Sequence, residues 1–364
     1  MKAGIVGLPN VGKSTLFNCL SNAKAQSANF PFCTIEPNVG VVNVPDARLD
    51  ELAKIVNPER VHPAVVEIVD IAGLVKGASK GEGLGNKFLA NIRETDAIIH
   101  VLRCFDNDNI VHVETTVDPV RDKEIIDFEL QLKDLEAVDK RLDRTKKAAR
   151  TGDKSAQKEL DVLIKVKESL ESAVSVRKIE LTESEREDFI KPLQLLTDKP
   201  TLYVCNVDDA SAVEGNAYVE AVREAVQDEN AEILILAVGT EADINELEDY
   251  EERQLFLDDI GLEEPGSAKL IRAAYKLLNL QTYFTAGVKE VRAWTIRVGD
   301  TAPKAAGVIH TDFEKGFIRV EVIKYTDFVE LGGEKQVKEL GKMKVEGKEY
   351  IVQDGDMMNF RFNV

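Results

Sequence analysis

The sequence has little of what marks several common protein classes. Its four cysteines, Cys19, Cys33, Cys104 and Cys205, lack the close paired spacing of a zinc site and are too few for a disulfide scaffold. No apolar run approaches the roughly 18 residues of a membrane span. A glycine-rich motif already begins at Gly7, too early to leave room for a signal peptide. We therefore expect a protein of the reducing cytoplasm, with no membrane attachment.

Positive charge is also scarce. The 47 Lys and Arg residues face 65 Asp and Glu residues, so the net charge is -18. So acidic a chain does not coat nucleic acid through its overall charge, and no specific DNA binding is expected. Any polyanionic partner must meet a local basic patch. A length of 364 residues with 44% hydrophobic composition indicates two or three compact units and excludes a disordered or fibrous chain.

Short apolar segments rich in β-branched residues recur along the chain. They lie at 3–6, 39–44, 64–71, 97–104, 201–206 and 232–238. Most are too apolar for a half-exposed sheet, and stretches of helical pattern at 13–20, 46–55 and 84–94 alternate with the early ones. This alternation predicts an α/β domain with a predominantly parallel sheet that an insertion interrupts.

The insertion, at about 125–196, has a different period. Apolar residues step by three and four through 128–142 and 160–174, and Thr151-Gly152-Asp153 between them is a natural helix stop. The pattern predicts an antiparallel helical hairpin, or coiled coil. Residues 133–178 carry 13 basic and 9 acidic side chains, a local charge of +4. The basic cluster near the predicted tip comprises Arg141, Arg144, Lys146, Lys147 and Arg150. It is either a solvated helix face or a contact for RNA.

From about residue 279 the pattern changes again. Segments 294–298, 317–322 and 350–352 are typical of short strands separated by glycine turns, which predicts a β-rich α+β terminal module. The expected organisation is one domain over 1–124 and 197–278, the hairpin over 125–196, and the terminal module over 279–364.

Residues 7–14 read GLPNVGKS, a full match to GxxxxGK[ST] placed after a strand and before a helix. Glycines let main-chain N–H groups face phosphates, Lys13 supplies a point charge, and the Ser14 hydroxyl can ligate Mg²⁺. The expected nucleotide contacts are Asn10, Val11, Gly12, Lys13, Ser14 and Thr15, with Lys13 also catalytic. The alternative is a glycine turn without a ligand.

Asp70 closes a buried apolar strand, where a carboxylate is costly unless a cation or hydrogen bonds satisfy it. We expect it to hold Mg²⁺ through water, and the Gly73 N–H to sense a γ-phosphate. Thr34, in the proline-broken segment 29–37, is a second candidate hydroxyl ligand that would be ordered by the γ-phosphate. The alternative for Asp70 is a turn or helix cap.

Several stretches resemble a known family. Residues 7–15, 29–37 and the glycine-rich 70–85 are similar to the Obg-type branch of the translation-factor GTPases. Residues 279–287 and 354–364 resemble the TGS module of the YchF subfamily, the Obg-like ATPases. The resemblance covers essentially the whole chain. It implies a P-loop G domain with an inserted hairpin, a terminal TGS domain, and hydrolysis of ATP to ADP and phosphate.

The same resemblance implies a nucleotide-controlled switch that binds the ribosome and regulates translation or a stress response. The basic hairpin and the TGS domain would contact ribosomal RNA. We expect such a protein to act as a monomer. Asn10 resembles a position associated with potassium activation in some related NTPases, which leaves K⁺ open as a further cofactor.

The segment Asn206-Val207-Asp208-Asp209 stands where relatives read guanine with N-K-x-D. Asn206 and Asp209 keep the spacing, but Val207 replaces the lysine, so the residues alone leave both ATP and GTP possible. The resemblance favours ATP, because Obg-like ATPases have this motif altered. Val238, after the last buried strand, resembles a main-chain contact to the base. A simple turn after a strand is the alternative.

Leu74 stands where many GTPases have the glutamine that orients the attacking water, so slow intrinsic turnover is expected. His112 lies in a polar segment beyond a strand end and could orient water as a neutral imidazole, with a packing role as the alternative. Three other functions stay open: a GTP-preferring ribosome-associated GTPase, an RNA-binding scaffold with structural nucleotide, and a metabolic phosphotransferase, for which no acceptor site is visible.

Overall fold

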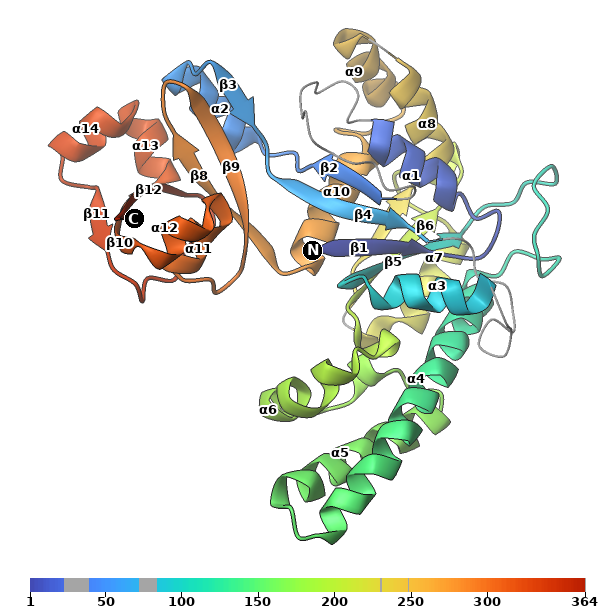
Figure 1. Cartoon of the computed structure of the whole chain (residues 1–364). Helices are drawn as coiled ribbons and strands as arrows, with labels where there is room; N and C mark the ends of the chain where they lie inside the picture. Colours follow the sequence, from blue (N-terminus) through green and yellow to red (C-terminus); the bar gives the residue numbers. More distant parts are fainter. Residues whose placement is uncertain (23–38, 72–83, 230, 248, 364) are drawn as a thin grey trace. The chain divides into compact units, whose positions relative to one another are not determined.

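The computed structural model describes residues 1–22, 39–71, 84–229, 231–247 and 249–363. The chain forms two compact units, each discontinuous in sequence (Figure 1). The first comprises Met1–Gly40 and Glu67–Leu270, and the second Val41–Val66 and Ile271–Val364. Each unit is built around one six-stranded sheet.

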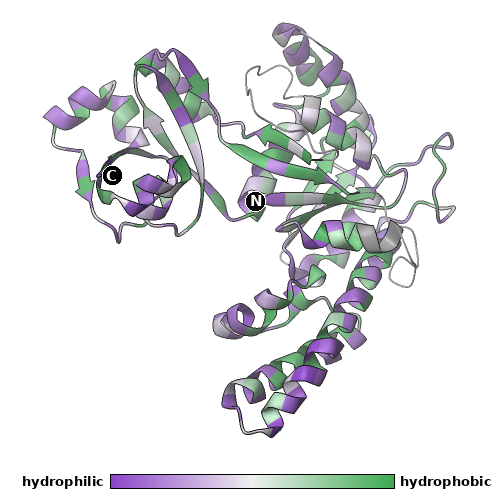
Figure 2. Cartoon of the chain, in the orientation of Figure 1, coloured by the Kyte–Doolittle hydropathy of each residue, from purple (hydrophilic) through white to green (hydrophobic). Residues whose placement is uncertain are grey.

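The sheet of the first unit has the order β2-β4-β1-β5-β6-β7. Its strands are β1 (Lys2–Val6), β2 (Val39–Asn43), β4 (Val65–Asp70), β5 (Ala97–Arg103), β6 (Thr201–Asn206) and β7 (Ile233–Leu236). The pairings that join β4, β1, β5, β6 and β7 are all parallel, and every residue of β5 and β6 is buried. Figure 2 shows these central strands as hydrophobic. The six strands predicted from the apolar segments are confirmed.

Helices cover this sheet and pack on it through apolar side chains. They are α1 (Lys13–Asn22), α3 (Leu84–Arg93), α7 (Ala217–Ala225) and α8 (Val238–Glu246). α9 (Tyr250–Asp259) follows in the same unit, and α10 (Gly266–Leu277) begins in this unit and continues into the second. On one side, Val219 and Val222 of α7 pack with Tyr203 and Cys205 of β6. Because the strands are parallel, their carboxyl ends, at Val6, Asp70, Arg103 and Asn206, meet at one edge of the sheet.

The predicted helical hairpin is present. α4 (Pro119–Arg150) and α5 (Lys154–Glu171) turn back on each other, and Figure 1 shows them extending from the sheet. α4 starts earlier than the apolar period indicated, because the Asp118 side chain accepts from the Arg121 N–H and Pro119 suits the first helical turn. Val138, Leu142, Leu163 and Val166 form the core between the helices. The short α6 (Glu183–Glu185) follows.

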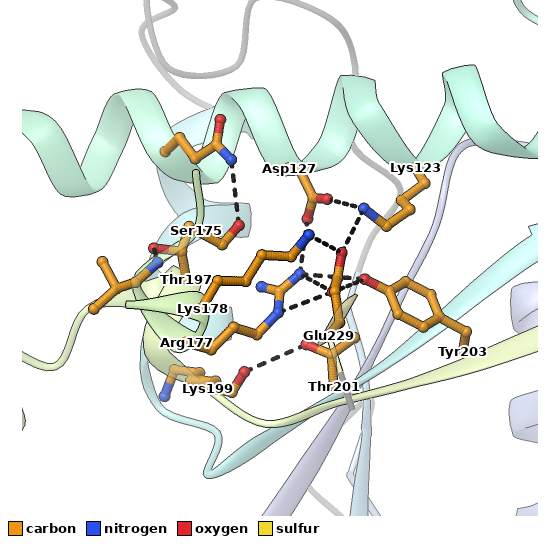
Figure 3. Close-up of polar contacts among 12 residues, drawn as sticks. Lys123, Asp127, Ser175, Arg177, Lys178, Thr197, Lys199, Thr201, Tyr203 and Glu229 are labelled. Carbon is orange, nitrogen blue, oxygen red and sulfur yellow. Dashed lines mark hydrogen bonds and ion pairs between the residues drawn. The ribbon is translucent and has the colours of Figure 1, made fainter. Parts of the chain in front are cut away.

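A cluster of charges, largely buried except at Lys178, lies at the base of the hairpin, and we call it the hairpin anchor (Figure 3). It comprises Lys123 and Asp127 of α4, Arg177 and Lys178 after α5, Tyr203 of β6, and Glu229 after α7. Glu229 is its centre: Arg177 Nη2 lies at 2.8 Å, Lys123 Nζ at 2.9 Å and the Tyr203 hydroxyl at 2.8 Å.

Glu229 stays ionised in this surrounding. Burial alone would raise the pKa of its carboxyl, but Arg177 and Lys123 outweigh burial and lower the pKa to about 2. Burial raises the pKa of the neighbouring Tyr203, so its hydroxyl stays a donor. Glu229 therefore joins all four elements, through its contacts with Lys123, Arg177 and Tyr203.

The second unit has a sheet of order β11-β10-β12-β8-β9-β3. Its strands are β3 (Arg60–His62), β8 (Leu280–Ala286), β9 (Glu290–Arg297), β10 (Phe317–Lys324), β11 (Lys344–Glu346) and β12 (Asp356–Phe362). Its helices are α2 (Ala47–Val56), α11 (Ala302–Ile309), α12 (Thr311–Lys315), α13 (Tyr325–Leu331) and α14 (Glu334–Glu339). Tyr283, Val320 and Phe360 lie in its core. The predicted α+β character of this part is confirmed.

Two features of the second unit differ from expectation. The strand predicted at 350–352 is wrong: only a single bridge joins Ile351 to Thr301. The Tyr350 hydroxyl and the Gln353 N–H both donate to buried Asp356, so this segment is an irregular connection to the turn at 354–355 that leads into β12. In addition, β3 pairs in parallel with β9 and brings residues 41–66 into this unit. The boundaries at 124, 196 and 278 stay a prediction.

Two further findings concern the cysteines and the helices of the described residues. Cys19, Cys104 and Cys205 are buried and free of disulfide bonds. Where the structure describes the chain, none of its helices combines the length and the apolarity that crossing a membrane requires.

The hairpin anchor yields a prediction about stability. Glu229→Gln removes the charge that Arg177, Lys123 and Lys178 share, and leaves the largely buried Lys123 and Arg177 with Asp127 in place of two carboxylates. We expect the free energy of unfolding in urea to fall by about 3 kcal/mol. The matched change Glu224→Gln on the exposed face of α7 should stay within about 0.5 kcal/mol of the parent. Equal stability of the two variants would contradict the role given to Glu229.

Candidate functional site

The loop between β1 and α1 holds the predicted phosphate-binding residues. Gly12 has φ of 96° and Asn10 has φ of 63°, in the left-handed region that glycine and asparagine tolerate best. A Cβ at Gly12 would collide with the side-chain nitrogen of Asn206. Val11 and Lys13 are buried, whereas Ser14 and Thr15 are exposed on the first turn of α1. The N–H groups of that turn have no helical partner and can bind an anion.

An ion pair closes this loop against the next strand of the sheet. Lys13 Nζ lies 2.8 Å from Asp70 Oδ1, and the two side chains are 8% and 17% exposed. The parallel register pairs Ile5 with Asp70. The loop that follows β1 therefore runs beside the end of β4, and Lys13 at the start of α1 lies next to Asp70. The carboxylate that the sequence analysis expected to need a cation thus has one within the chain.

Asn206 connects three parts of the site through one buried side chain. Its Nδ2 donates to the Val11 carbonyl at 2.9 Å, and its Oδ1 accepts from the Val238 N–H at 3.0 Å. The structure therefore brings Asn206 and Val238 together with the phosphate loop. Val207 is buried among apolar side chains, while exposed Asp209 accepts from the Thr240 hydroxyl.

His112 is also near the loop, but it is fully hydrogen-bonded. Its Nε2 lies 2.8 Å from Asp122 Oδ2, and its Nδ1 accepts from the Glu114 N–H at 3.1 Å. Both His112 and Asp122 are buried. In this geometry neither ring nitrogen can contact a water molecule, so a catalytic role requires the imidazole to leave Asp122. The assignment of His112 to catalysis stays a prediction.

Arg103, which the sequence pattern does not single out, organises the segment that carries His112. Its side chain is buried at the end of β5 and donates to three carbonyls, those of Phe105, Asn107 and Ile110. We call residues 104–115 the β5 loop. Asn10 Nδ2 donates to the Val111 carbonyl at 3.0 Å and so joins the β5 loop to the phosphate loop. In the sequence, this role could have been inferred from a single arginine at the end of an otherwise apolar strand.

A second histidine and the basic cluster of the hairpin lie elsewhere in this unit. His100 is buried within β5, and burial lowers its pKa to about 4, so it is neutral. The five basic residues of the cluster near the hairpin tip lie on the last turns of α4 and are exposed; Arg141 is paired with Glu159 at 2.6 Å. Thr34, Gly73 and Leu74 lie outside the described residues.

Comparisons with known proteins agree with this geometry. A family profile described as "50S ribosome-binding GTPase" matches residues 2–139. A second profile, YchF-GTPase_C, described as a protein of unknown function, matches residues 280–363. The fold and the phosphate loop define a P-loop nucleotide-binding protein of the GTPase class.

Similar sequences and a solved structure identify the family within this class. The chain is 61% identical to "Ribosome-binding ATPase YchF" of Haemophilus ducreyi, over 100% of this chain and 99% of the relative, and 54% identical to the Bacillus subtilis protein of the same name, over 100% of both. The solved YchF GTPase of Schizosaccharomyces pombe superposes with a TM-score of 0.90 at 38% identity, covering 99% of this chain and 97% of that one. The chain belongs to the YchF family.

Arg103 yields the second prediction. Arg103→Lys keeps the charge but cannot reach three carbonyls at once, because an ammonium lacks the planar fork of a guanidinium. We expect the protein to lose about 2 kcal/mol of stability, and amide hydrogen exchange to quicken first at residues 105–112. Arg223→Lys, an exposed site on α7, is the control. Unchanged exchange in the β5 loop would show that Arg103 does not hold it.

Proposed function

We propose that this chain is a Mg²⁺-dependent NTPase that hydrolyses ATP to ADP and phosphate, and that its nucleotide state controls binding to the ribosome. The observation that carries the first part is the phosphate loop with Lys13 against Asp70. The name of the full-length relatives, "Ribosome-binding ATPase YchF", supports both parts. A cytoplasmic monomer that regulates translation or a stress response is the setting we propose for this activity.

Phosphate binding would use groups that the fold already presents. The main-chain N–H groups around Val11, Gly12 and Ser14 would face the phosphates, and Lys13 would turn from Asp70 to the β- and γ-phosphates. Asn10 and Thr15 would complete this shell. Once phosphate draws Lys13 away, Asp70 is left with a free carboxylate beside the Ser14 end of α1.

The donors near that carboxylate fit Mg²⁺. Carboxylate and hydroxyl oxygens are the ligands it prefers, and Ser14 and Asp70 supply one of each, with Asp70 acting through water. Thr34 is the proposed third donor, and the Gly73 N–H the proposed contact to the γ-phosphate. When bound, Mg²⁺ supplies positive charge that neutralises the phosphate oxygens. A potassium ion near Asn10 remains part of the proposal.

The purine would lie where β6 and β7 end. Asn206 holds the phosphate loop to Val238, while Val207 and Asp209 flank it. Without the lysine of N-K-x-D, this site lacks a side chain that packs along guanine, and we propose that ATP is preferred, with GTP also bound. His112 is the proposed group that orients the attacking water, after release from Asp122.

Ribosome binding would use two surfaces of this acidic chain, of which the first is locally basic. One is the exposed basic cluster at the hairpin tip. The other is the terminal part, 279–364, which we propose is a TGS domain that contacts ribosomal RNA. The domain limits 1–124, 125–196 and 197–278 belong to the same proposal.

Lys13→Ala tests the nucleotide assignment. Loss of the ammonium should lower the rate of ATP hydrolysis at least about 100-fold, since it removes about 3 kcal/mol of charge stabilisation, and calorimetry should show weaker Mg-ATP binding. Lys158→Ala, on the exposed face of α5, should behave as the parent does. A Lys13→Ala variant that binds and hydrolyses ATP normally would refute the site. GTP binding tenfold tighter than ATP, about 1.4 kcal/mol, would overturn the ATP preference.

Charge removal at the hairpin tests the ribosome contact. Arg144, Lys146 and Lys147 are exposed, and replacing all three by Gln should weaken ribosome co-sedimentation about tenfold and flatten its dependence on salt. Replacing Lys191, Arg223 and Lys269, which are exposed elsewhere in the first unit, is the matched control. If both triple variants bind with the affinity and salt dependence of the parent, the hairpin does not dock on RNA.

A further inference from the structure

All the methionines after Met1 line a single groove. The chain has four methionines, and Met343, Met357 and Met358 are found together in the second unit, around a groove of about 410 Å³. Phe313 and Phe362 also line it, and neither is fully buried. Met357 and Met358 are buried, with 5% and 4% of their surface exposed. Methionine side chains are flexible and polarisable, so they can adjust their packing when an apolar partner binds in the groove.

The groove runs along a strand edge. β12 pairs with β10 along its length, from Lys324–Asp356 to Phe317–Phe362. On its other side, β12 pairs with β8 only at Met357–Phe284, and β8 ends at Ala286, where the chain turns through Gly287. Residues 359–362 of β12 continue past this end, and Asn359, Phe360 and Phe362 line the groove. Within the described residues, no strand pairs with this part of the edge.

The charges of the groove have one sign. Its charged lining residues are Glu290, Glu321 and Glu334, and among the residues that the structure describes no lysine or arginine lines it. The glutamates have partners outside the lining: Glu321 accepts from Arg361 at 3.0 Å, Glu334 pairs with Lys338, and Glu290 lies 3.5 Å from His62. Arg361 and Lys338 are exposed, and exposed pairs contribute little, so an incoming cation can exchange with them.

We propose that this groove binds an extended peptide segment in which basic and apolar side chains alternate, and that the segment adds as a strand beside residues 359–362 of β12. Main-chain hydrogen bonds would supply affinity, as in other cases of strand addition. The period of two would direct the apolar side chains to Phe313 and Phe362 on one face of β12, and the basic ones to Glu321, which lies opposite Asn359 on the other face, and to Glu334. This site is a protein-binding surface, independent of the nucleotide and of RNA.

The test uses the full chain with ¹³C-labelled methionine methyl groups. The probe is a blocked eight-residue peptide of alternating Lys and Val. We expect its addition to shift the signals of Met343, Met357 and Met358, leave Met1 unchanged, and bind more weakly as salt rises. An alternating Glu and Val peptide should cause at least tenfold weaker shifts. Equal binding of the two peptides would overturn the proposal.

Variants of the groove distinguish recognition of charge from non-specific hydrophobic binding. The double change Glu290→Lys with Glu334→Lys should weaken binding of the Lys and Val peptide at least tenfold. Glu339→Lys with Glu349→Lys, two exposed glutamates of the same unit outside the groove, should leave it unchanged. Should the first double variant not fold, Glu334→Gln alone is expected to weaken binding about threefold. The proposal is contradicted if the groove variants bind the Lys and Val peptide with the affinity of the parent. It is also contradicted if a single-stranded RNA of twenty nucleotides shifts the signals of the same three methyl groups.

Discussion

The ion pair between Lys13 and Asp70 is the interaction on which the rest of the site depends. It exists because β1 and β4 run parallel in a register that pairs Ile5 with Asp70, and because Gly12 lets the loop pass close to Asn206. Two largely buried charges of opposite sign are stable together and costly apart. A ligand that separates them must therefore bring both a negative and a positive charge, as a magnesium-bound triphosphate does.

The surroundings of this pair form a continuous set of polar contacts. Asn206 joins the phosphate loop to Val238, and Asn10 joins the phosphate loop to the β5 loop. Arg103 in turn donates hydrogen bonds to carbonyls of the β5 loop. β5 and β6 lead from these contacts back into the sheet, and Tyr203 of β6 belongs to the hairpin anchor. The same two buried strands, β5 and β6, therefore connect the nucleotide site to the base of the hairpin.

Much of this architecture could be predicted because it rests on local patterns. Buried parallel strands are continuously apolar, the hairpin has a helical period, and GLPNVGKS combines glycines with Lys13 in the order that a phosphate loop requires. The strand predicted at 350–352 is wrong because its three residues are apolar enough for a strand, whereas short-range hydrogen bonds from Tyr350 and Gln353 to Asp356 hold the segment as an irregular connection. Arg103, the bonded state of His112, and the pairing of β3 with β9 likewise depend on partners that sequence spacing does not reveal.

The most direct measurement is a crystal structure of the full chain with a non-hydrolysable ATP analogue and Mg²⁺. The account predicts that the phosphates lie on the N–H groups of residues 11–14, that Lys13 Nζ has moved from Asp70 to the phosphates, and that Asp70 faces the metal through water. An analogue bound elsewhere, with the 2.8 Å contact between Lys13 and Asp70 intact, would contradict it.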